Sequence, residues 1–203
     1  MEKLRLVRPE KKYEKQAVKY LEEFLAAGSK IHGVGGLDQY KDDYDGWLEK
    51  LAADRVQVPN EERVPSETFF LMKRLSRESH MFQEDVERLV GMVSIRLVLN
   101  DNLWNFGGHI GYSIRPSERE KGYNKVNLYL ALKVCQNYGI EVALLDCDRS
   151  NIGSAKTMRA LGGKMVRQYQ LGDIVVQRYA IDVDAALCKY ASQYDKFVSG
   201  YPD

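Results

Sequence analysis

The chain has 203 residues, enough to bury a substantial core, and its 30 lysine and arginine side chains almost balance its 29 aspartate and glutamate side chains. A net charge of +1 excludes a broad electrostatic surface for DNA, RNA or an anionic membrane. No apolar run approaches the roughly 20 residues of a spanning helix, and the charged N-terminus is unlike a secretion signal. Three cysteines without a Cys-x-x-Cys pair predict free thiols in a reducing compartment, so we expect a cytoplasmic protein without nucleic-acid or membrane partners.

The N-terminal third of the sequence predicts one strand and two helices. Residues 4–7 form a short apolar run typical of a strand, and residues 13–27 carry apolar side chains at helical spacing. A glycine-rich connection at 29–36 then leads to a second helical pattern at 37–54. Such a connection is suited to border a pocket.

The middle of the sequence predicts three successive strands, a β-meander. The runs 66–75, 89–99 and 109–115 are rich in apolar residues or alternate in polarity, as strands do. The polar stretch 76–88 is predicted as an extended turn between the first two strands. Asparagines and glycines between residues 100 and 108 supply the second turn.

The last third predicts a helix at 123–138, a strand at 141–148, a helix at 152–161, a hairpin at 164–181 and a short helix from 182. The strand at 141–148 has an unbroken apolar centre, as in strands that are covered on both faces. Because a helix separates it from the strand before, the two strands are predicted to be a parallel pair. Asn151 is suited to cap the second helix.

The most informative segment is residues 115–125, which we call the phosphate turn. Pro116 cannot donate to a sheet ladder, and Gly122 allows a tight turn into the following helix. The unpaired amides and the positive dipole end of a helix N-terminus favour phosphate, and Arg119, Lys121 and Lys125 add positive charge. The turn therefore predicts a site for a phosphorylated cofactor, and the alternative is a solvated start of a surface helix.

Four short motifs follow one another from this turn onward. They are Ile-Arg-Pro at 114–116, Arg119-x-x-Gly122, Asn151-x-x-Ser154 and Leu-Gly-Gly at 161–163. With these motifs in this order, the chain resembles the GNAT superfamily of acyl-CoA-dependent N-acetyltransferases. The sequence of residues 107–119 resembles a bacterial branch of predicted acetyltransferases.

The resemblance implies an α/β fold, with a central, mostly antiparallel twisted sheet, a splayed parallel pair in its middle, and helices on both faces. It also implies a single domain over 1–203: residues 1–65 border the acceptor site, 66–181 form the sheet and cofactor core, and 182–203 form a tail. The co-substrate would be acetyl-CoA, and the acetyl group would pass directly to an amine of a small molecule or peptide.

The resemblance also implies the residues of the site. Main-chain amides around Tyr112 would hold the pantetheine arm and polarise the thioester carbonyl, which makes Tyr112 a candidate catalytic residue. The candidate cofactor-binding residues are Ser113, Ile114, Arg119, Glu120, Lys121, Gly122, Tyr123, Asn124, Lys125, Asn151 and Ser154. Three scattered histidines without paired cysteines or carboxylates predict no metal site.

Two positions depart from the family pattern. Asn124 stands where the family keeps glycine or alanine in the turn. Met158 stands where the family keeps a tyrosine that protonates the leaving thiolate, and a thioether cannot donate a proton. The resemblance therefore does not supply a general acid.

His109 is the first candidate for a general base, because its pKa is suited to proton transfer near neutral pH and it begins the splayed strand. A structural hydrogen bond at a strand end is the equal alternative. His32, in the glycine-rich connection, would line the acceptor side and give it shape.

Two other functions remain open from the sequence. A non-catalytic acyl-CoA binding or sensing module would explain Met158 and Asn124, and an interaction protein would bind no CoA at all. The last hairpin offers a free edge, which leaves a homodimer open. The sequence does not identify the amine.

Overall fold

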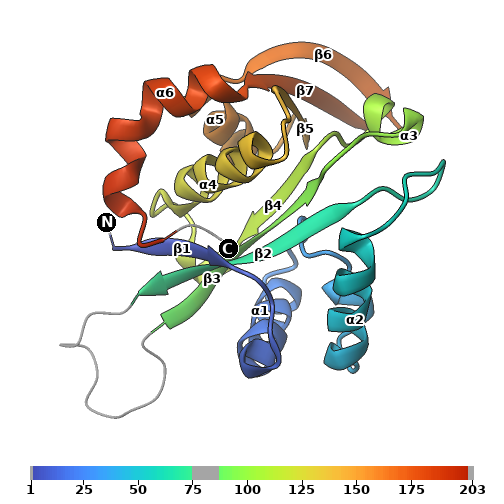
Figure 1. Ribbon diagram of the computed structural model, residues 1–203, viewed down its shortest axis with the longest axis vertical. Helices are drawn as coiled ribbons and strands as arrows, with labels where there is room; N and C mark the ends of the chain where they lie inside the picture. The colour runs from blue at the N-terminus through green and yellow to red at the C-terminus, as the bar shows by residue number, and fades with distance from the viewer. Residues whose placement is uncertain (1, 75–86, 201–203) are drawn as a thin grey trace.

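The computed structural model describes residues 2–74 and 87–200. Two antiparallel sheets lie at its centre (Figure 1). The first sheet contains, in order, β1 (Leu4–Val7), β2 (Ser66–Arg74), β3 (Glu87–Arg96) and β4 (Ile110–Ile114). The second sheet contains, in order, β5 (Val142–Asp148), β7 (Ile174–Asp182) and β6 (Lys164–Leu171).

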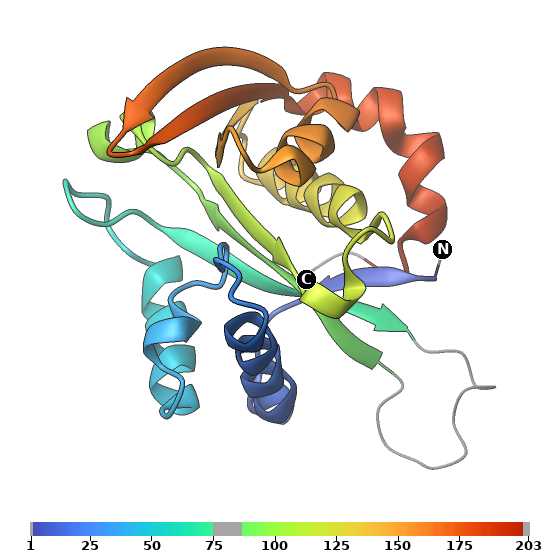
Figure 2. The same cartoon turned by 180° about the vertical axis from the view of Figure 1, so that it is seen from behind.

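The helices cover both faces of the first sheet. One face carries α1 (Glu14–Ala26) and α2 (Tyr44–Arg55), and the other carries α4 (Tyr123–Asn137). Helices α5 (Ile152–Ala160) and α6 (Val183–Tyr194) pack against α4 on its side away from α1 and α2. Figures 1 and 2 both place the short helix α3 (Asp101–Asn105) beside the far end of the β6–β7 hairpin.

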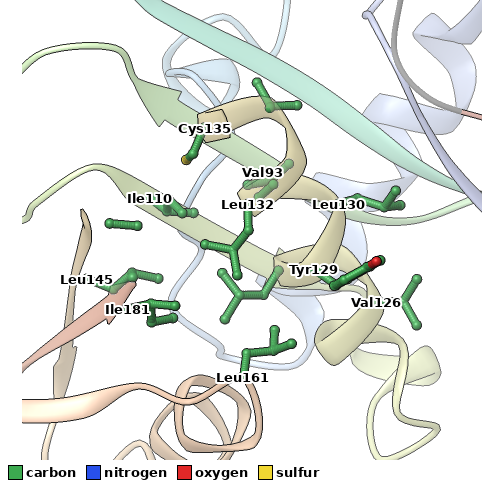
Figure 3. Packing of buried hydrophobic residues seen from close by; sticks show 14 of the residues in the cluster. Val93, Ile110, Val126, Tyr129, Leu130, Leu132, Cys135, Leu145, Leu161 and Ile181 are labelled. Atoms are coloured by element: carbon green, nitrogen blue, oxygen red, sulfur yellow. The ribbon is translucent and has the colours of Figure 1, made fainter. Parts of the chain in front are cut away.

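Two apolar cores hold these layers together. The larger core surrounds α4 between the two sheets, and Figure 3 shows Leu132 of this helix close to Ile110 of the first sheet and Leu145 and Ile181 of the second. The smaller core joins α1 and α2 to the opposite face of the first sheet around Trp47 and Phe70. Because α4 is buried against both sheets, its N-terminus is held in a fixed place.

The predicted α/β fold with mostly antiparallel strands and helices on both faces is confirmed. The predicted helix at 37–54 begins late, however. Residues Leu37–Gln39 form only a 3-10 turn, and α2 starts at Tyr44, where Asp43 Oδ1 accepts a hydrogen bond of 2.9 Å from Gly46 N. The cap of Asp43 therefore sets the helix start, because a bonded N-cap is preferred to an uncapped longer helix.

Two other elements differ from the prediction. The turn predicted between 100 and 108 contains α3, whose first turn is capped by Asn100 Oδ1 accepting from Leu103 N at 3.0 Å. The short helix predicted from 182 is α6, twelve residues long, capped by Asp182. Most of the predicted turn at 76–88 lies outside the described residues.

The sequence predicts a splayed parallel pair of β4 and β5, and within the described residues no parallel ladder joins these strands. The two strands lie in separate sheets, and one isolated bridge, Gly108 to Leu145, joins them and is antiparallel. Gly107 and Gly108 have φ angles of 102° and 68°, so the chain turns locally just before β4 and cannot start a regular ladder there. The predicted splay is thus more complete than expected.

Candidate active site

The edge of β4 that faces away from β3 carries free main-chain groups. Arg96 N donates to His109 O at 2.8 Å, and Arg115 N donates to Val90 O at 2.9 Å. In an antiparallel ladder the bonded residues alternate, so Gly111 and Ser113 also pair with β3. The N–H groups of Tyr112 and Ile114 therefore point away from β3.

β4 and β5 form a fork that is closed at one end. His109 N donates to Leu144 O at 2.7 Å, and Leu144 N donates to His109 Nδ1 at 3.1 Å. Past this point no ladder joins the two strands within the described residues. The Tyr112 side chain reaches α5 across the fork, with its hydroxyl 2.9 Å from Ser154 Oγ.

The phosphate turn leads from the open end of the fork into α4. Residues Pro116–Glu118 form a 3-10 turn, and Glu120 and Gly122 both have positive φ angles, 62° and 82°. Gly122 is the N-cap of α4, and no side chain among residues 2–74 and 87–200 caps the amides of its first turn. These amides are therefore available to an anion.

The three cations of the turn have different partners. Lys121 Nζ lies 2.9 Å from Glu118 Oε2 and 3.0 Å from Ser117 O, so its charge is already neutralised. Arg119 donates to Ser29 Oγ at 3.0 Å and to Ile114 O at 3.3 Å. Lys125 is exposed. The predicted contribution of Lys121 to phosphate binding is therefore not supported by the geometry.

Glu118 explains the position of Lys121. Its carboxyl is only 2% exposed and lies within 3.4 Å of Lys73, Arg88 and Lys121. Burial alone raises the pKa of Glu118, but the hydrogen bond from Lys121 and the charges of Lys73 and Arg88 outweigh it and leave the pKa below its ordinary value. Glu118 thus fixes the turn as a buried counter-ion.

α5 closes the fork opposite β4. Asn151 Oδ1 caps this helix by accepting from Ser154 N at 3.0 Å. Asn124 reaches from α4 to α5, where its Nδ2 donates to Thr157 Oγ1 at 3.4 Å, while its buried Oδ1 has no hydrogen-bond partner in the described part of the chain. A buried carbonyl oxygen without a donor is costly, so this oxygen is suited to a ligand that donates.

A family model described as an acetyltransferase (GNAT) domain matches residues 36–164, more than half of the chain. The chain belongs to the GNAT acetyltransferase family. The resemblance drawn from the sequence motifs is confirmed, and membership makes the chain an acyltransferase. A comparison with curated proteins finds no match.

Solved structures agree with the GNAT fold. A chimera of the spermidine N-acetyltransferase SpeG from Vibrio cholerae and hSSAT is 12% identical, with a TM-score of 0.58 over 91% of this chain and 99% of that one. The yncA protein from Salmonella typhimurium, solved with acetyl-CoA, is 12% identical, with a TM-score of 0.57 over 89% and 94%. The self-immunity acetyltransferase MccE, solved with acetyl-CoA and AMP, is 17% identical, with a TM-score of 0.59 over 88% and 91%.

Two candidate residues of this GNAT domain are held in structural bonds. Ser113 Oγ donates to His32 O at 2.6 Å and accepts from Tyr20 at 3.0 Å, on the face of β4 that meets α1. His109 Nδ1 accepts from Leu144 N, so the other ring nitrogen carries the proton of the neutral ring. The geometry favours the structural alternative for His109 and gives Ser113 no direct path to the fork.

Burial and nearby cations weaken His109 further as a base. Burial, together with the charges of Arg96 and Arg178, lowers the pKa of His109 to about 4. The ring is therefore neutral at pH 7 and a weak proton acceptor. Tyr123 is also directed away from the fork, because its hydroxyl bonds to Glu2 and only its main chain belongs to the α4 N-terminus.

Met158 is fully buried in the apolar core beneath α5, which is consistent with its inability to act as an acid. The hydroxyl inside the fork belongs to Tyr112, and burial raises its pKa far above the ordinary value. Sequence reasoning missed this Tyr112–Ser154 pair because 42 residues separate the partners. It also missed Arg96, although a charged residue within the alternating run 89–99 could have identified it as a candidate site residue. Within the described ranges no group of histidines, cysteines and carboxylates could hold a metal.

Proposed function

We propose that this GNAT protein transfers an acetyl group from acetyl-CoA to an amine of a small molecule or peptide. The observation that carries the proposal is the line of free main-chain donors that runs from Tyr112 and Ile114 to the uncapped N-terminus of α4. Hydrogen-bond donors of this kind suit an elongated ligand that ends in a diphosphate.

The described residues fit this co-substrate. The amides of Gly122, Tyr123 and Asn124, with the Lys125 side chain, would hold the diphosphate, and the N–H groups of Tyr112 and Ile114 would hold the pantetheine arm. The orphaned Oδ1 of Asn124 lies where α4 meets α5 and would accept from a ligand N–H or O–H group. When bound, acetyl-CoA supplies a thioester whose acyl carbon is open to attack by an amine.

Tyr112 is our candidate for the proton donor that Met158 cannot be. The Tyr112 hydroxyl is protonated at neutral pH, and Ser154 Oγ, 2.9 Å away, is placed to return a proton to it. Attack by the neutral amine would form the new N–C bond, and the C–S bond would then break. The thiolate sulfur would take the Tyr112 proton, while the amine nitrogen would release its proton to solvent, from which Ser154 could reprotonate Tyr112.

Replacing Tyr112 with phenylalanine tests this role. We expect Tyr112→Phe to lower kcat by about a hundredfold to ten-thousandfold without changing the Kd for acetyl-CoA, a range typical of lost general acid catalysis. Tyr20→Phe is the matched control, because it removes a buried, hydrogen-bonded hydroxyl on the opposite face of β4. Equal losses in both variants would contradict the role of Tyr112.

Release of free thiol tests the function itself. The protein should release CoA thiol from acetyl-CoA only when an acceptor amine is present. Acetyl-CoA should also raise the unfolding temperature, since a ligand that binds only the folded state stabilises it. Stabilisation without release for any amine would favour a binding or sensing module, and no stabilisation would favour an interaction protein.

Two finer properties belong to the same proposal. The β6 strand is the free edge of the second sheet and exposes Met165 and Val166, which supports a homodimer through this edge. Sedimentation equilibrium would show a monomer if this is wrong.

The described cysteines are all free, which supports a reducing, cytoplasmic location. Within residues 2–74 and 87–200, no helix has the length and apolarity to cross a bilayer.

A further inference from the structure

Arg96 at the end of β3 carries a positive charge with almost no partner. Its side chain makes one hydrogen bond among the described residues, from NH1 to Gly108 O at 3.3 Å, and no described carboxylate lies within 4 Å of it. Burial lowers the pKa of Arg96, although the more distant Asp146 opposes this effect. A half-buried guanidinium with one long bond is a costly arrangement unless a ligand supplies an anion.

Arg96 lies where an acceptor would meet the fork. The main chain of Arg96 pairs with His109, and its NH1 lies 3.9 Å from the position that a Cβ on Gly111 would occupy. Gly33, in the glycine-rich connection, packs directly on the same spot, since a Cβ on Gly33 would lie 2.1 Å from Gly111 O. Gly111 directly precedes Tyr112, which we place beside the thioester.

The charges around Arg96 are positive, and the nearby carboxylates are already paired. Burial and the charges of Lys30 and Arg96 lower the pKa of His32, and no acidic group opposes this effect. Burial and the charges of Arg96 and Arg178 likewise lower the pKa of His109. Asp146 is paired with Arg178 at 2.7 Å.

The other acidic contacts nearby are also satisfied. Asp146 accepts from Tyr169 at 2.6 Å and from Gly107 N at 2.7 Å, and Asp148 accepts from Ser150. The positive charge of Arg96 therefore remains uncompensated within the described part of the chain.

We propose that Arg96 binds a carboxylate of the amine acceptor, so that the substrate is an amine that also carries a carboxylate, such as an amino acid. This inference rests on the proposed acetyl transfer and narrows its acceptor. A guanidinium binds a carboxylate through two parallel hydrogen bonds. One guanidinium beside two neutral histidines balances a single negative charge, which favours a carboxylate over a dianionic phosphate or a cationic polyamine.

Matched pairs of acceptors test the inference. Initial rates of thiol release are measured for common L-amino acids, for their α-amides, for O-phosphoethanolamine and for spermidine. Wild-type protein should favour the best amino acid over its amide by at least about tenfold in kcat/KM, since lost charge pairing of this kind costs 1.4 kcal/mol or more. Arg96→Gln should abolish this preference, while Arg96→Lys should retain part of it.

Controls separate a loss of acceptor binding from a loss of cofactor binding. Arg55→Gln removes an exposed positive charge on α2 and should keep the preference. The stabilisation by acetyl-CoA should be the same in wild type and Arg96→Gln. A preference for spermidine, phosphoethanolamine or the amides in wild type, or an equal loss for acid and amide in Arg96→Gln, would overturn the inference while leaving acetyl transfer intact.

A readout without turnover keeps the inference testable if the protein proves non-catalytic. With saturating CoA, the preferred amino acids should raise the unfolding temperature of wild type and not of Arg96→Gln. No shift with any of them, or equal shifts in both proteins, would overturn the carboxylate site. Failure of acetyl transfer alone would appear as a shift without thiol release.

Discussion

At the scale of single residues, the two glycines at the ends of α4 allow a matched test of the phosphate turn. Gly122 and Gly139 have φ angles of 82° and 70°, and a Cβ on Gly139 would meet no atom within 4 Å. Gly122→Ala and Gly139→Ala should each lower the free energy of unfolding by about 1 kcal/mol through backbone strain. Only Gly122→Ala should weaken acetyl-CoA binding, which calorimetric titration would measure. Similar affinities in both variants would contradict the site.

The residues of this site were predictable only where a local rule fixed them. The turn at Gly122 and the cap at Asn151 follow from short-range geometry, and the structure has both. The ion pair of Lys121 with the buried Glu118 was not predictable, because Glu118 becomes buried only when Lys73 and Arg88 of other strands pack against it. The role of Ser113 stays a prediction; the sequence did not show that its side chain meets α1, because a strand's period of two does not say which face meets the cofactor.

At the scale of secondary-structure elements, the junction of the two sheets depends on Gly108. A Cβ at this position would lie 2.4 Å from Leu144 O, and the φ angle of 68° adds strain. Gly108→Ala should therefore lower the free energy of unfolding by more than about 2 kcal/mol, because strain and a main-chain clash add. Gly172→Ala, with a φ angle of 56° and open space around it, should cost only about 1 kcal/mol. Urea unfolding of both variants checks this, and equal losses would contradict it.

Periodicity located the strands and long helices because each pattern is local to its element. The start of α2, the helix α3 and the pairing of β4 with β5 depended instead on caps and on the turn at Gly107 and Gly108. A strand, helix and strand in succession predict direction well, but they do not predict that two strands will separate into different sheets.

At the scale of the whole molecule, stability should fall with acidity. The pKa of His109 is about 4 in the folded chain, whereas the ordinary value of 6.5 applies to the unfolded chain. Between pH 4 and pH 6.5 the unfolded chain therefore binds more protons than the folded chain. The contribution of His109 is complete above pH 6.5 and is lost as the pH falls towards 4. From pH 7.5 to 5 this loss is about 2 kcal/mol of unfolding free energy.

Replacing His109 with asparagine isolates this contribution, because the asparagine Oδ1 can still accept from Leu144 N but does not titrate. The difference in unfolding free energy between pH 7.5 and pH 5 should shrink by about 2 kcal/mol relative to wild type. His32, whose pKa is lowered in the same direction, should account for part of the remainder. An unchanged difference in His109→Asn would contradict the buried neutral histidine.

We expect the closed end of the fork to limit the length of the acyl group. Ile110 and Leu145 are 3% and 1% exposed beside the Gly108–Leu145 bridge, and α4 packs against both (Figure 3). Close-packed side chains at this end leave little room, so each further methylene of a longer acyl group that reached it would have to displace one of them. Selectivity for short acyl groups would then be a property of the core itself. We expect lower rates of thiol release from propionyl-CoA than from acetyl-CoA, and lower rates again from butyryl-CoA.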